Sequence, residues 1–355
     1  MKRRLYILLL TIVWSAFTNA QNTSLVFFEA DHPSIQYTGR IDFSNAKLPR
    51  FWQPGVYITT RFSGRECEII LNDEMLWGKN NNYLEIVVDG IPTRIQTKAK
   101  RDTIRIGNKF TDGEHSLVIS KNTEANIGYL ELVGIRCANL LPPPAWPQRK
   151  IEFIGNSITC GAGSDTTLVG CGKGQWHDQH NAYMSYGALT ARHLNARYHL
   201  SAVSGIGLMH SCCGMSITMP PVFDKISMRD DTIQWNFARF QPDVVTICLG
   251  QNDGVQDSAV FSHNYLAFLK TLRGHYPQST FILLSSPMAD ERLRAFQHKI
   301  LTAIIKKSKA EGEQKIDGYF FKRQYYKGCD WHPSLEEHGL IAGELVAFLR
   351  KKIKW

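Results

Sequence analysis

IEFIGNSITCG, residues 151–161, is the stretch that decides the fold of the carboxyl-terminal half of this 355-residue chain. It reads as an apolar strand that ends at Gly155, where a tight turn is permitted, and it leaves Ser157 beyond the strand. Strands and helices alternate from there to the end of the chain, which predicts a parallel sheet with helices on both faces. The strands are expected at 150–154, 197–203, 243–249, 280–284 and 319–321, and the helices at 182–194, 258–272, 291–309 and 335–352.

Four short motifs stand where strands of this sheet end or where the last helix begins. The chemistry of such sheets lies beyond the carboxyl ends of the strands, so these positions are candidates for an active site. Ser157 follows the first strand, Gly205 the second and Asn252 the third. His332 precedes the last helix, with Asp330 two residues before it. Each position alone also has an ordinary structural explanation, as a helix cap or a turn residue.

Residues from about 25 to 138 have a different pattern, in which short β-branched or alternating runs are separated by turn signals. Several short strands at this spacing predict an all-β sandwich. A stretch with four prolines, residues 141–147, follows and favours an extended link. We therefore divide the chain into a leader at 1–20, a β-sandwich at 21–140, a linker at 141–149 and an α/β domain at 150–355. The expected turns in the sandwich are Ser63-Gly64, Asn72-Asp73, Asp89-Gly90 and Asp112-Gly113.

The first 20 residues have the three parts of an export signal. Lys2-Arg3-Arg4 is a positive region, residues 5–17 are almost wholly apolar, and Ala20 is a small residue at the cleavage point. The apolar run is shorter than the roughly 20 residues that a membrane span needs. We therefore expect cleavage after Ala20 and a secreted or periplasmic protein that is not held in a membrane. The alternative is an uncleaved amino-terminal anchor.

Charge and cysteine content narrow the class of protein further. The formal net charge of +9, from 41 Lys and Arg against 32 Asp and Glu, is spread thinly, so nucleic-acid binding is not expected. His177 and His180 with Cys171 fit no metal-ligand spacing, and we expect neither a metal nor a cofactor.

Export permits disulfides, and Cys160 and Cys171 could close a short loop, although the sequence does not fix the pairing. Cys248 lies in a strand and is expected in the core.

The motifs in the order Ser, Gly, Asn, His together resemble the SGNH (GDSL-type) hydrolase superfamily. Gly155-Asn156-Ser157 stands where most members have Gly-Asp-Ser, and residues 250–253 match the Gly-x-Asn-Asp block. One residue, where many members have two, separates Asp330 from His332. The whole chain is similar more specifically to the second carbohydrate-esterase family, whose members pair a jelly-roll sandwich with an SGNH domain. The similar stretches are residues 39–43, 49–55, 87–90, 155–161, 181–187 and 328–333.

This resemblance implies an esterase that removes acetyl groups from plant polysaccharides of the xylan or mannan type, with a preference for the sugar 6-position. Ser157 would be the nucleophile and His332 the general base. The Ser157 N–H, the Gly205 N–H and the Asn252 amide would form the oxyanion hole. The resemblance implies no cofactor, an acetylated polysaccharide or oligosaccharide as partner, and a monomer.

The residue that orients His332 has two candidates, the Asp330 carboxylate and a backbone carbonyl. Because the residue before Pro333 avoids the helical region, we expect an extended segment in which Asp330 reaches the imidazole. Trp331, Trp176 and His177 are candidates for contact with the sugar, with core or lid roles as the alternative.

Two other functions stay open at this level. One is an SGNH lipase or thioesterase, and the other is a non-catalytic carbohydrate-binding protein on a hydrolase fold. The presence of Ser157, Asn252 and His332 argues against the second. A small, closed acyl pocket would indicate an acetyl esterase, whereas a long apolar groove would indicate a lipase.

Overall fold

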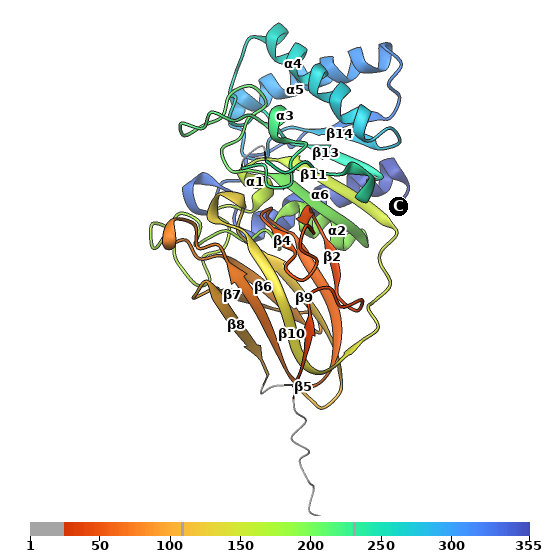
Figure 1. Ribbon diagram of the computed structural model, residues 1–355. Helices are drawn as coiled ribbons and strands as arrows, with labels where there is room; N and C mark the ends of the chain where they lie inside the picture. Colours follow the sequence, from red (N-terminus) through yellow and green to blue (C-terminus); the bar gives the residue numbers. More distant parts are fainter. Residues whose placement is uncertain (1–24, 108–109, 230–231) are drawn as a thin grey trace, which may run out of the picture.

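The computed structural model describes residues 25–107, 110–229 and 232–355, and the expected export signal at 1–20 lies outside them. A β-rich domain and an α/β domain are stacked end to end (Figure 1), one with an antiparallel and the other with a parallel sheet. This arrangement confirms the expected fold class. In the described part of the chain, no helix is both long enough and apolar enough to cross a membrane.

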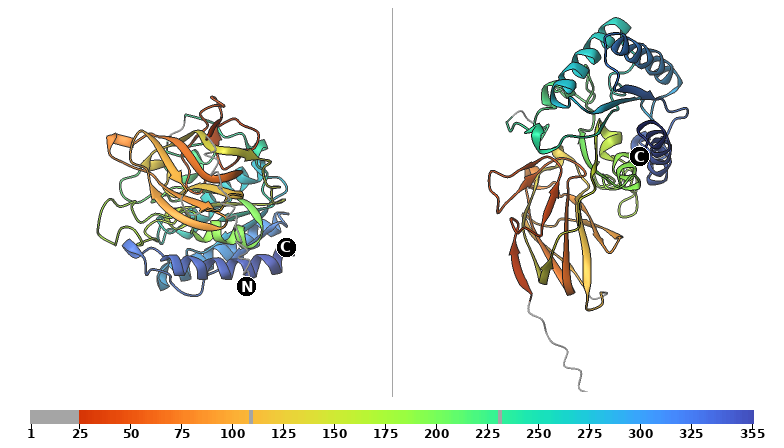
Figure 2. Two further views of the ribbon diagram at one scale, coloured as in Figure 1. Left: turned by 90° about the horizontal axis from the view of Figure 1, so that it is seen from below. Right: turned by 90° about the vertical axis from the view of Figure 1, so that its right-hand side faces the viewer.

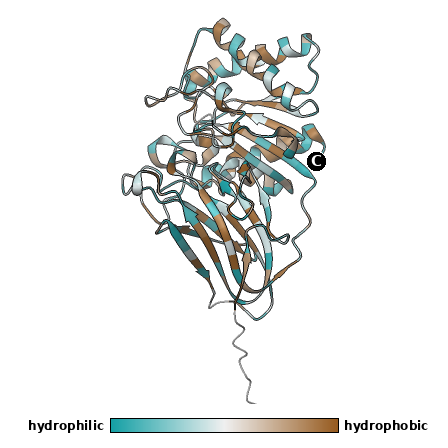
Figure 3. Ribbon diagram, in the orientation of Figure 1, coloured by the Kyte–Doolittle hydropathy of each residue, from teal (hydrophilic) through white to brown (hydrophobic). Residues whose placement is uncertain are grey.

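Within the described residues, the amino-terminal domain has these strands: β1 (Val26–Glu29), β2 (Gln36–Thr38), β3 (Ile41–Asp42), β4 (Arg50–Phe51), β5 (Tyr57–Asp73), β6 (Tyr83–Val88), β7 (Ile91–Gln96), β8 (Arg101–Ile106), β9 (Glu114–Lys121) and β10 (Leu130–Leu141). Two short 3₁₀ helices, η1 (Leu76–Gly78) and η2 (Ala125–Ile127), lie between them. Alternate side chains of the strands, among them Phe62, Ile119 and Leu132, fill one apolar core. Figure 3 shows the resulting bands of apolar and polar residues along the strands.

The expected turn at Ser63-Gly64 is wrong, because β5 runs through it without reversing. Gly64 has a φ of 103°, a value that glycine adopts freely. The register against β10 shifts here, from Cys67 opposite Cys137 to Ser63 opposite Asn139, which is a bulge. It lets β5 pair with β9 before this point and with β8 after it. The other three expected turns lie at strand ends.

The carboxyl-terminal domain contains the strands β11 (Arg149–Gly155), β12 (Ala196–Ala202), β13 (Val244–Ile247), β14 (Thr280–Leu284) and β15 (Ile316–Tyr319). Its helices are α1 (Ser157–Cys160), α2 (Tyr186–His193), α3 (Met219–Val222), α4 (Ser258–His275), α5 (Glu291–Ala310) and α6 (Leu335–Ile353), with 3₁₀ turns η3 (Phe237–Arg239) and η4 (Cys329–Trp331). All pairings in the sheet are parallel, in the order β12-β11-β13-β14-β15. Helices α2 and α6 cover one face, and α4 and α5 cover the other.

Two of the expected elements are shifted along the sequence. The helix expected from residue 182 begins at Tyr186, because Ser185 is extended and forms its N-cap. The last strand ends at Tyr319 instead of beginning there, since the buried Ile316 pairs with Phe281 of β14. The other helices and strands expected in the α/β domain agree with the structure to within a few residues.

The two domains share a buried interface (Figure 2). Trp52 of the sandwich packs in one apolar cluster with Trp235 of the α/β domain. Gln53 Nε2 donates to the Ser227 carbonyl oxygen at 2.6 Å across the same interface. The proline-rich stretch lies between the end of β10 and the start of β11. The domains are therefore joined by packing as well as by the connecting chain.

The structure settles the cysteine pairing that the sequence leaves open. Cys171 forms a disulfide with Cys329, so the possible pair with Cys160 does not form. Cys160 is a buried free thiol at the end of α1, 3.5 Å from the Glu124 carboxylate, whereas Cys171 lies in an exposed loop. Cys248 is buried and free, as expected for a core residue.

Candidate active site

Ser157 is the first residue of α1, directly beyond the carboxyl end of β11. Asn156 caps this short helix, because its side chain accepts the Ile158 N–H at 3.1 Å. Gly155 is required by close packing, since a β-carbon there would lie 2.0 Å from the Thr159 hydroxyl oxygen. Asn156 therefore caps the helix, and the Ser157 side chain is not needed as the cap.

The Ser157 hydroxyl oxygen lies 2.8 Å from His332 Nε2, although 175 positions separate the two residues. His332 follows η4 and has a ψ of 162°, the extended conformation expected before Pro333. With its proton on Nδ1, a neutral imidazole accepts the serine proton at Nε2. This is the geometry of a nucleophile next to its general base.

The other ring nitrogen, His332 Nδ1, faces the Cys329 carbonyl oxygen at 3.3 Å. The segment before His332 is not extended as expected, because Asp330 and Trp331 have φ values of 50° and 60°, in the left-handed region. These two residues curl the chain so that a backbone carbonyl, instead of the Asp330 carboxylate, meets the ring. Asp330 is exposed at the rim of the pocket, and among the described residues no hydrogen bond joins its carboxylate to His332.

Burial lowers the pKa of His332 below its usual 6.5, and the nearby His180 lowers it further. The hydrogen bond to the Cys329 carbonyl and the neighbouring Asp330 oppose this shift, because both stabilise the imidazolium. The lowered pKa therefore favours the neutral ring at neutral pH. A general base must be in this state to accept a proton.

Gly205 and Asn252 line the same pocket as Ser157 and His332, so the structure brings together the four positions singled out in the sequence. Gly205 has a φ of 82° in the turn after β12. Asn252 Nδ2 donates one proton to the Ile206 carbonyl oxygen at 2.7 Å, and a side-chain amide has a second proton to donate. A peptide N–H and an amide at this place are suitable donors for an oxyanion.

The pocket has a cavity of about 420 Å³, and its wall beside Gly205 is formed by sulfur-containing side chains. Cys212 and Cys213 are joined by a disulfide and line the pocket together with Met215. A β-carbon on Gly205 would lie 2.9 Å from Met215 Sδ and 3.0 Å from Cys212 Sγ. Sulfur atoms therefore pack closely against the backbone at Gly205 on this side of the pocket.

The three side chains expected to contact sugar lie in different environments. Trp176 is 50% exposed and lines the pocket. Trp331 is 74% exposed, and its ring lies 6.1 Å from that of Tyr326. His177 is buried and does not line the pocket, and burial lowers its pKa to about 4. The core role weighed for these residues therefore fits His177, while the two tryptophans present aromatic surface.

The sandwich domain also reaches the site, which the sequence did not predict. Asn126 lines the pocket, and the fully buried Glu124 accepts the Ser204 N–H at 2.5 Å. Its other carboxylate oxygen lies 3.5 Å from His180 Nε2. Burial alone would raise the pKa of Glu124, but the nearby His180 and the hydrogen bond from the Ser204 N–H lower it. A charged carboxylate thus holds the residue next to Gly205, and no sequence motif marks it.

Two family models match the chain. The model for the carbohydrate esterase 2 N-terminal domain matches residues 37–144, and that for the GDSL-like lipase/acylhydrolase family matches residues 153–334. The acetylxylan esterase / glucomannan deacetylase of Cellvibrio japonicus is 30% identical over 373 residues, which cover 100% of each chain. The cellulase/esterase CelE of Acetivibrio thermocellus is 31% identical over 92% of this chain, which spans only 40% of that protein.

Solved structures agree with these matches. A family two carbohydrate esterase from Clostridium thermocellum, in complex with cellohexaose, has a TM-score of 0.82 and 30% identity, covering 90% of this chain and 99% of that one. A family two carbohydrate esterase from Cellvibrio japonicus has a TM-score of 0.82 and 27% identity, covering 94% of this chain and 99% of that one. The chain therefore belongs to the family two carbohydrate esterases and is a carboxylic ester hydrolase with a GDSL-like catalytic domain.

Proposed function

We propose that the protein removes O-acetyl groups from plant polysaccharides of the xylan or mannan type, including those at the sugar 6-position. The observation that carries this proposal is the 2.8 Å contact of Ser157 with His332, in one pocket with Gly205 and Asn252. The name of the fully covered Cellvibrio relative, an acetylxylan esterase / glucomannan deacetylase, supports the substrate class. The cellohexaose bound to the Clostridium structure supports a sugar chain as ligand.

The reaction begins when His332 Nε2 takes the proton of Ser157 and the serine oxygen attacks the acetyl carbonyl carbon. The carbonyl electron pair moves to the oxygen, and the N–H groups of Ser157 and Gly205 and the Asn252 amide stabilise the oxyanion. Donors of this kind contribute about 10²–10³-fold each to the rate. The Cys329 carbonyl accepts the proton on Nδ1 and stabilises the imidazolium.

The tetrahedral intermediate then breaks its bond to the sugar oxygen, which takes the proton from His332 Nε2. Ser157 is left as an acetyl ester, and the deacetylated sugar departs. Water attacks this ester with His332 again as general base, and the same donors stabilise the second oxyanion. Return of the proton to Ser157 releases acetate and restores the free enzyme.

The sulfur wall of the pocket supports a short acyl group. Cys212 and Met215 lie close to Gly205, beside the place where the acyl methyl group must sit when the oxyanion faces its donors. A long acyl chain would have to displace them. This observation favours an acetyl esterase over the alternative, a lipase or thioesterase.

The sugar side of the substrate would contact the aromatic residues. We propose that Trp176 and Trp331 bind sugar rings, because both are exposed and aromatic faces pack well against the apolar faces of sugars. We also propose that the protein is exported, with cleavage after Ala20, and acts as a monomer. The support for export is the pattern of residues 1–20.

The test compares p-nitrophenyl acetate, butyrate and octanoate, together with release of acetate from acetylated xylan and glucomannan. We expect the acetate ester to have the highest kcat/KM and both polysaccharides to be deacetylated. Ser157→Ala should keep the fold and reduce activity about 10³-fold or more. A kcat/KM that rises with chain length would favour the lipase, and a Ser157→Ala activity within about tenfold of wild type would contradict the assigned nucleophile.

A further inference from the structure

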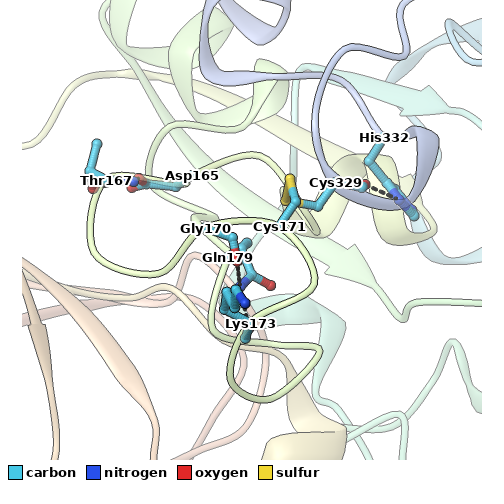
Figure 4. The surroundings of a disulfide bond; sticks show 8 residues. All are labelled: Asp165, Thr167, Gly170, Cys171, Lys173, Gln179, Cys329 and His332. Atoms are coloured by element: carbon cyan, nitrogen blue, oxygen red, sulfur yellow. Dashed lines mark hydrogen bonds between the residues drawn. A yellow bond between two sulfur atoms is a disulfide. The ribbon is translucent and has the colours of Figure 1, made fainter.

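The loop that carries His332 is covalently tied to a second loop next to the active site (Figure 4). Cys329, whose carbonyl oxygen meets His332 Nδ1, forms a disulfide with Cys171. The two cysteines are 158 positions apart in the sequence, and their Cα atoms are 5.2 Å apart. Cys329 is 3% exposed, whereas Cys171 is at the surface. The group that orients the general base is therefore part of a cross-link.

The backbone between Cys329 and His332 needs external support. Asp330 and Trp331 are both left-handed, and consecutive non-glycine residues in this region persist only where their surroundings hold them. The Cys329 N–H donates to the Gly163 carbonyl oxygen at 2.7 Å, and the His332 N–H donates to the Cys329 carbonyl oxygen at 3.0 Å. The disulfide adds a covalent restraint at the first residue of this curled segment.

The other end of the cross-link is itself anchored. Gln179, which is 4% exposed, donates from Nε2 to the carbonyl oxygens of Gly170 at 3.1 Å and Lys173 at 3.0 Å. These two carbonyls flank Cys171 on either side in the sequence, and Figure 4 shows the Gln179 side chain reaching into this loop. The loop of Cys171 is therefore held in place by these hydrogen bonds. Through the disulfide, Cys171 can restrain the position of Cys329.

We infer that the Cys171–Cys329 disulfide positions His332 for catalysis by fixing the Cys329 carbonyl, in place of the carboxylate that orients the base in a three-residue triad. Its sulfur atoms act through Cys329 and are positioning groups. A backbone carbonyl orients an imidazole only if its own chain is held in place, and the cross-link is a covalent restraint on that chain. The inference rests on the proposed function, because it concerns the same Ser157–His332 pair.

The test is the Cys171→Ser/Cys329→Ser double variant, which removes the cross-link and leaves the Cys329 backbone carbonyl in the chain. With p-nitrophenyl acetate we expect kcat to fall about tenfold or more, because a displacement of about 1 Å can cost up to about 10²-fold. KM should stay within about twofold, since the change concerns the base and not substrate contacts. The acid limb of kcat/KM should also move to lower pH, because the carbonyl hydrogen bond that raises the His332 pKa is weakened.

A matched control separates positioning from stability. Leu132→Ala leaves a cavity in the sandwich core at a residue that does not line the active-site pocket, and should lower Tm while kcat stays at the wild-type value. Gln179→Leu releases the Cys171 loop but keeps the disulfide, and we expect a smaller fall in kcat in the same direction. All variants are assayed well below their Tm.

Reduction of the folded protein gives a second measurement if the double variant does not fold. The Cys212→Ser/Cys213→Ser variant keeps Cys171–Cys329, so a reductant should lower its kcat by about the same factor as the double substitution. A wild-type kcat and pH profile in the double variant, or no effect of the reductant once the thiols are shown to be free, would overturn the inference. A wild-type protein without activity on acetyl esters would contradict the proposed function instead.

Discussion

Arg40 of the sandwich and Glu152 of β11 form an ion pair of 2.9 Å across the domain interface, with side chains only 1% and 0% exposed. Arg40 also donates to the carbonyl oxygens of Phe223 and Lys225. The Ser201 hydroxyl donates to the same carboxylate at 2.5 Å. The charge of Glu152, deep in the α/β domain, is thus neutralised by a residue of the other domain.

Arg40→Met should destabilise the protein by about 3–5 kcal/mol, because it leaves the Glu152 charge buried without its partner. Denaturant unfolding measures the loss, and activity per folded molecule should be unchanged. The Arg40→Met/Glu152→Met double variant should recover much of the stability, since an apolar pair can replace a buried ion pair. If the free energy of unfolding of the Arg40→Met variant is less than about 1 kcal/mol below that of the wild type, the ion pair is not needed for stability.

Glu124→Ala should lower kcat about tenfold or more with little change in KM, because the Ser204–Gly205 turn then loses the carboxylate that holds the Ser204 N–H. Glu124→Gln keeps an acceptor oxygen at the same place and should retain most of the activity. Steady-state kinetics on p-nitrophenyl acetate distinguish the two variants. If both behave alike, the carboxylate does not act through this hydrogen bond.

Asn252→Ala should lower kcat about 10²-fold with KM little changed, because an oxyanion donor acts mainly in the transition state. The Ile206 carbonyl oxygen, which accepts one proton of the amide, would lose its partner at the same time. Thermal unfolding of the variant controls for that local effect. A change in KM alone would place Asn252 in substrate binding instead.

Asp330→Ala should cost less than about tenfold in kcat/KM, because the Cys329 carbonyl and not the carboxylate meets His332 Nδ1. The sequence favoured the opposite result, and removing a triad aspartate costs about 10⁴-fold. The measurement is kcat/KM across pH for the variant and the wild type. A loss of about 10³-fold or more would return the orienting role to the carboxylate.

The pH profile of kcat/KM should have its acid limb below pH 6.5, because burial and the nearby His180 lower the pKa of His332. The active form is the neutral imidazole, so the rate falls as the pH drops through this lowered pKa and the ring becomes protonated. His180→Gln removes the second cause and should move the limb to higher pH. A limb that stays in place would mean that His180 does not act on His332.

The sequence predicted the two folds and the meeting of Ser157, Gly205, Asn252 and His332, because a parallel sheet places the ends of its strands at one edge. It could not predict the orienting group, since a backbone carbonyl has no sequence signature and the left-handed Asp330 and Trp331 follow no pattern in the residue types.

The other differences between the sequence-based expectations and the structure also arise from tertiary contacts. Glu124 and Cys171 lie far in sequence from the groups that they contact, Ser204 and Cys329, and only the packing of the domains and loops brings them together. The sequence indicates a reversal at Gly64 where the structure has a bulge, because a glycine after a serine is equally typical of a turn.

The contacts of Glu124 and Arg40 bear on protein engineering. A fragment that began near residue 149 would keep the Ser157–His332 pair and yet lack the acceptor of the Ser204 N–H and the cation beside Glu152. The sandwich therefore cannot be exchanged or trimmed like an appended sugar-binding module. A fusion enzyme built from this protein has to include both domains together.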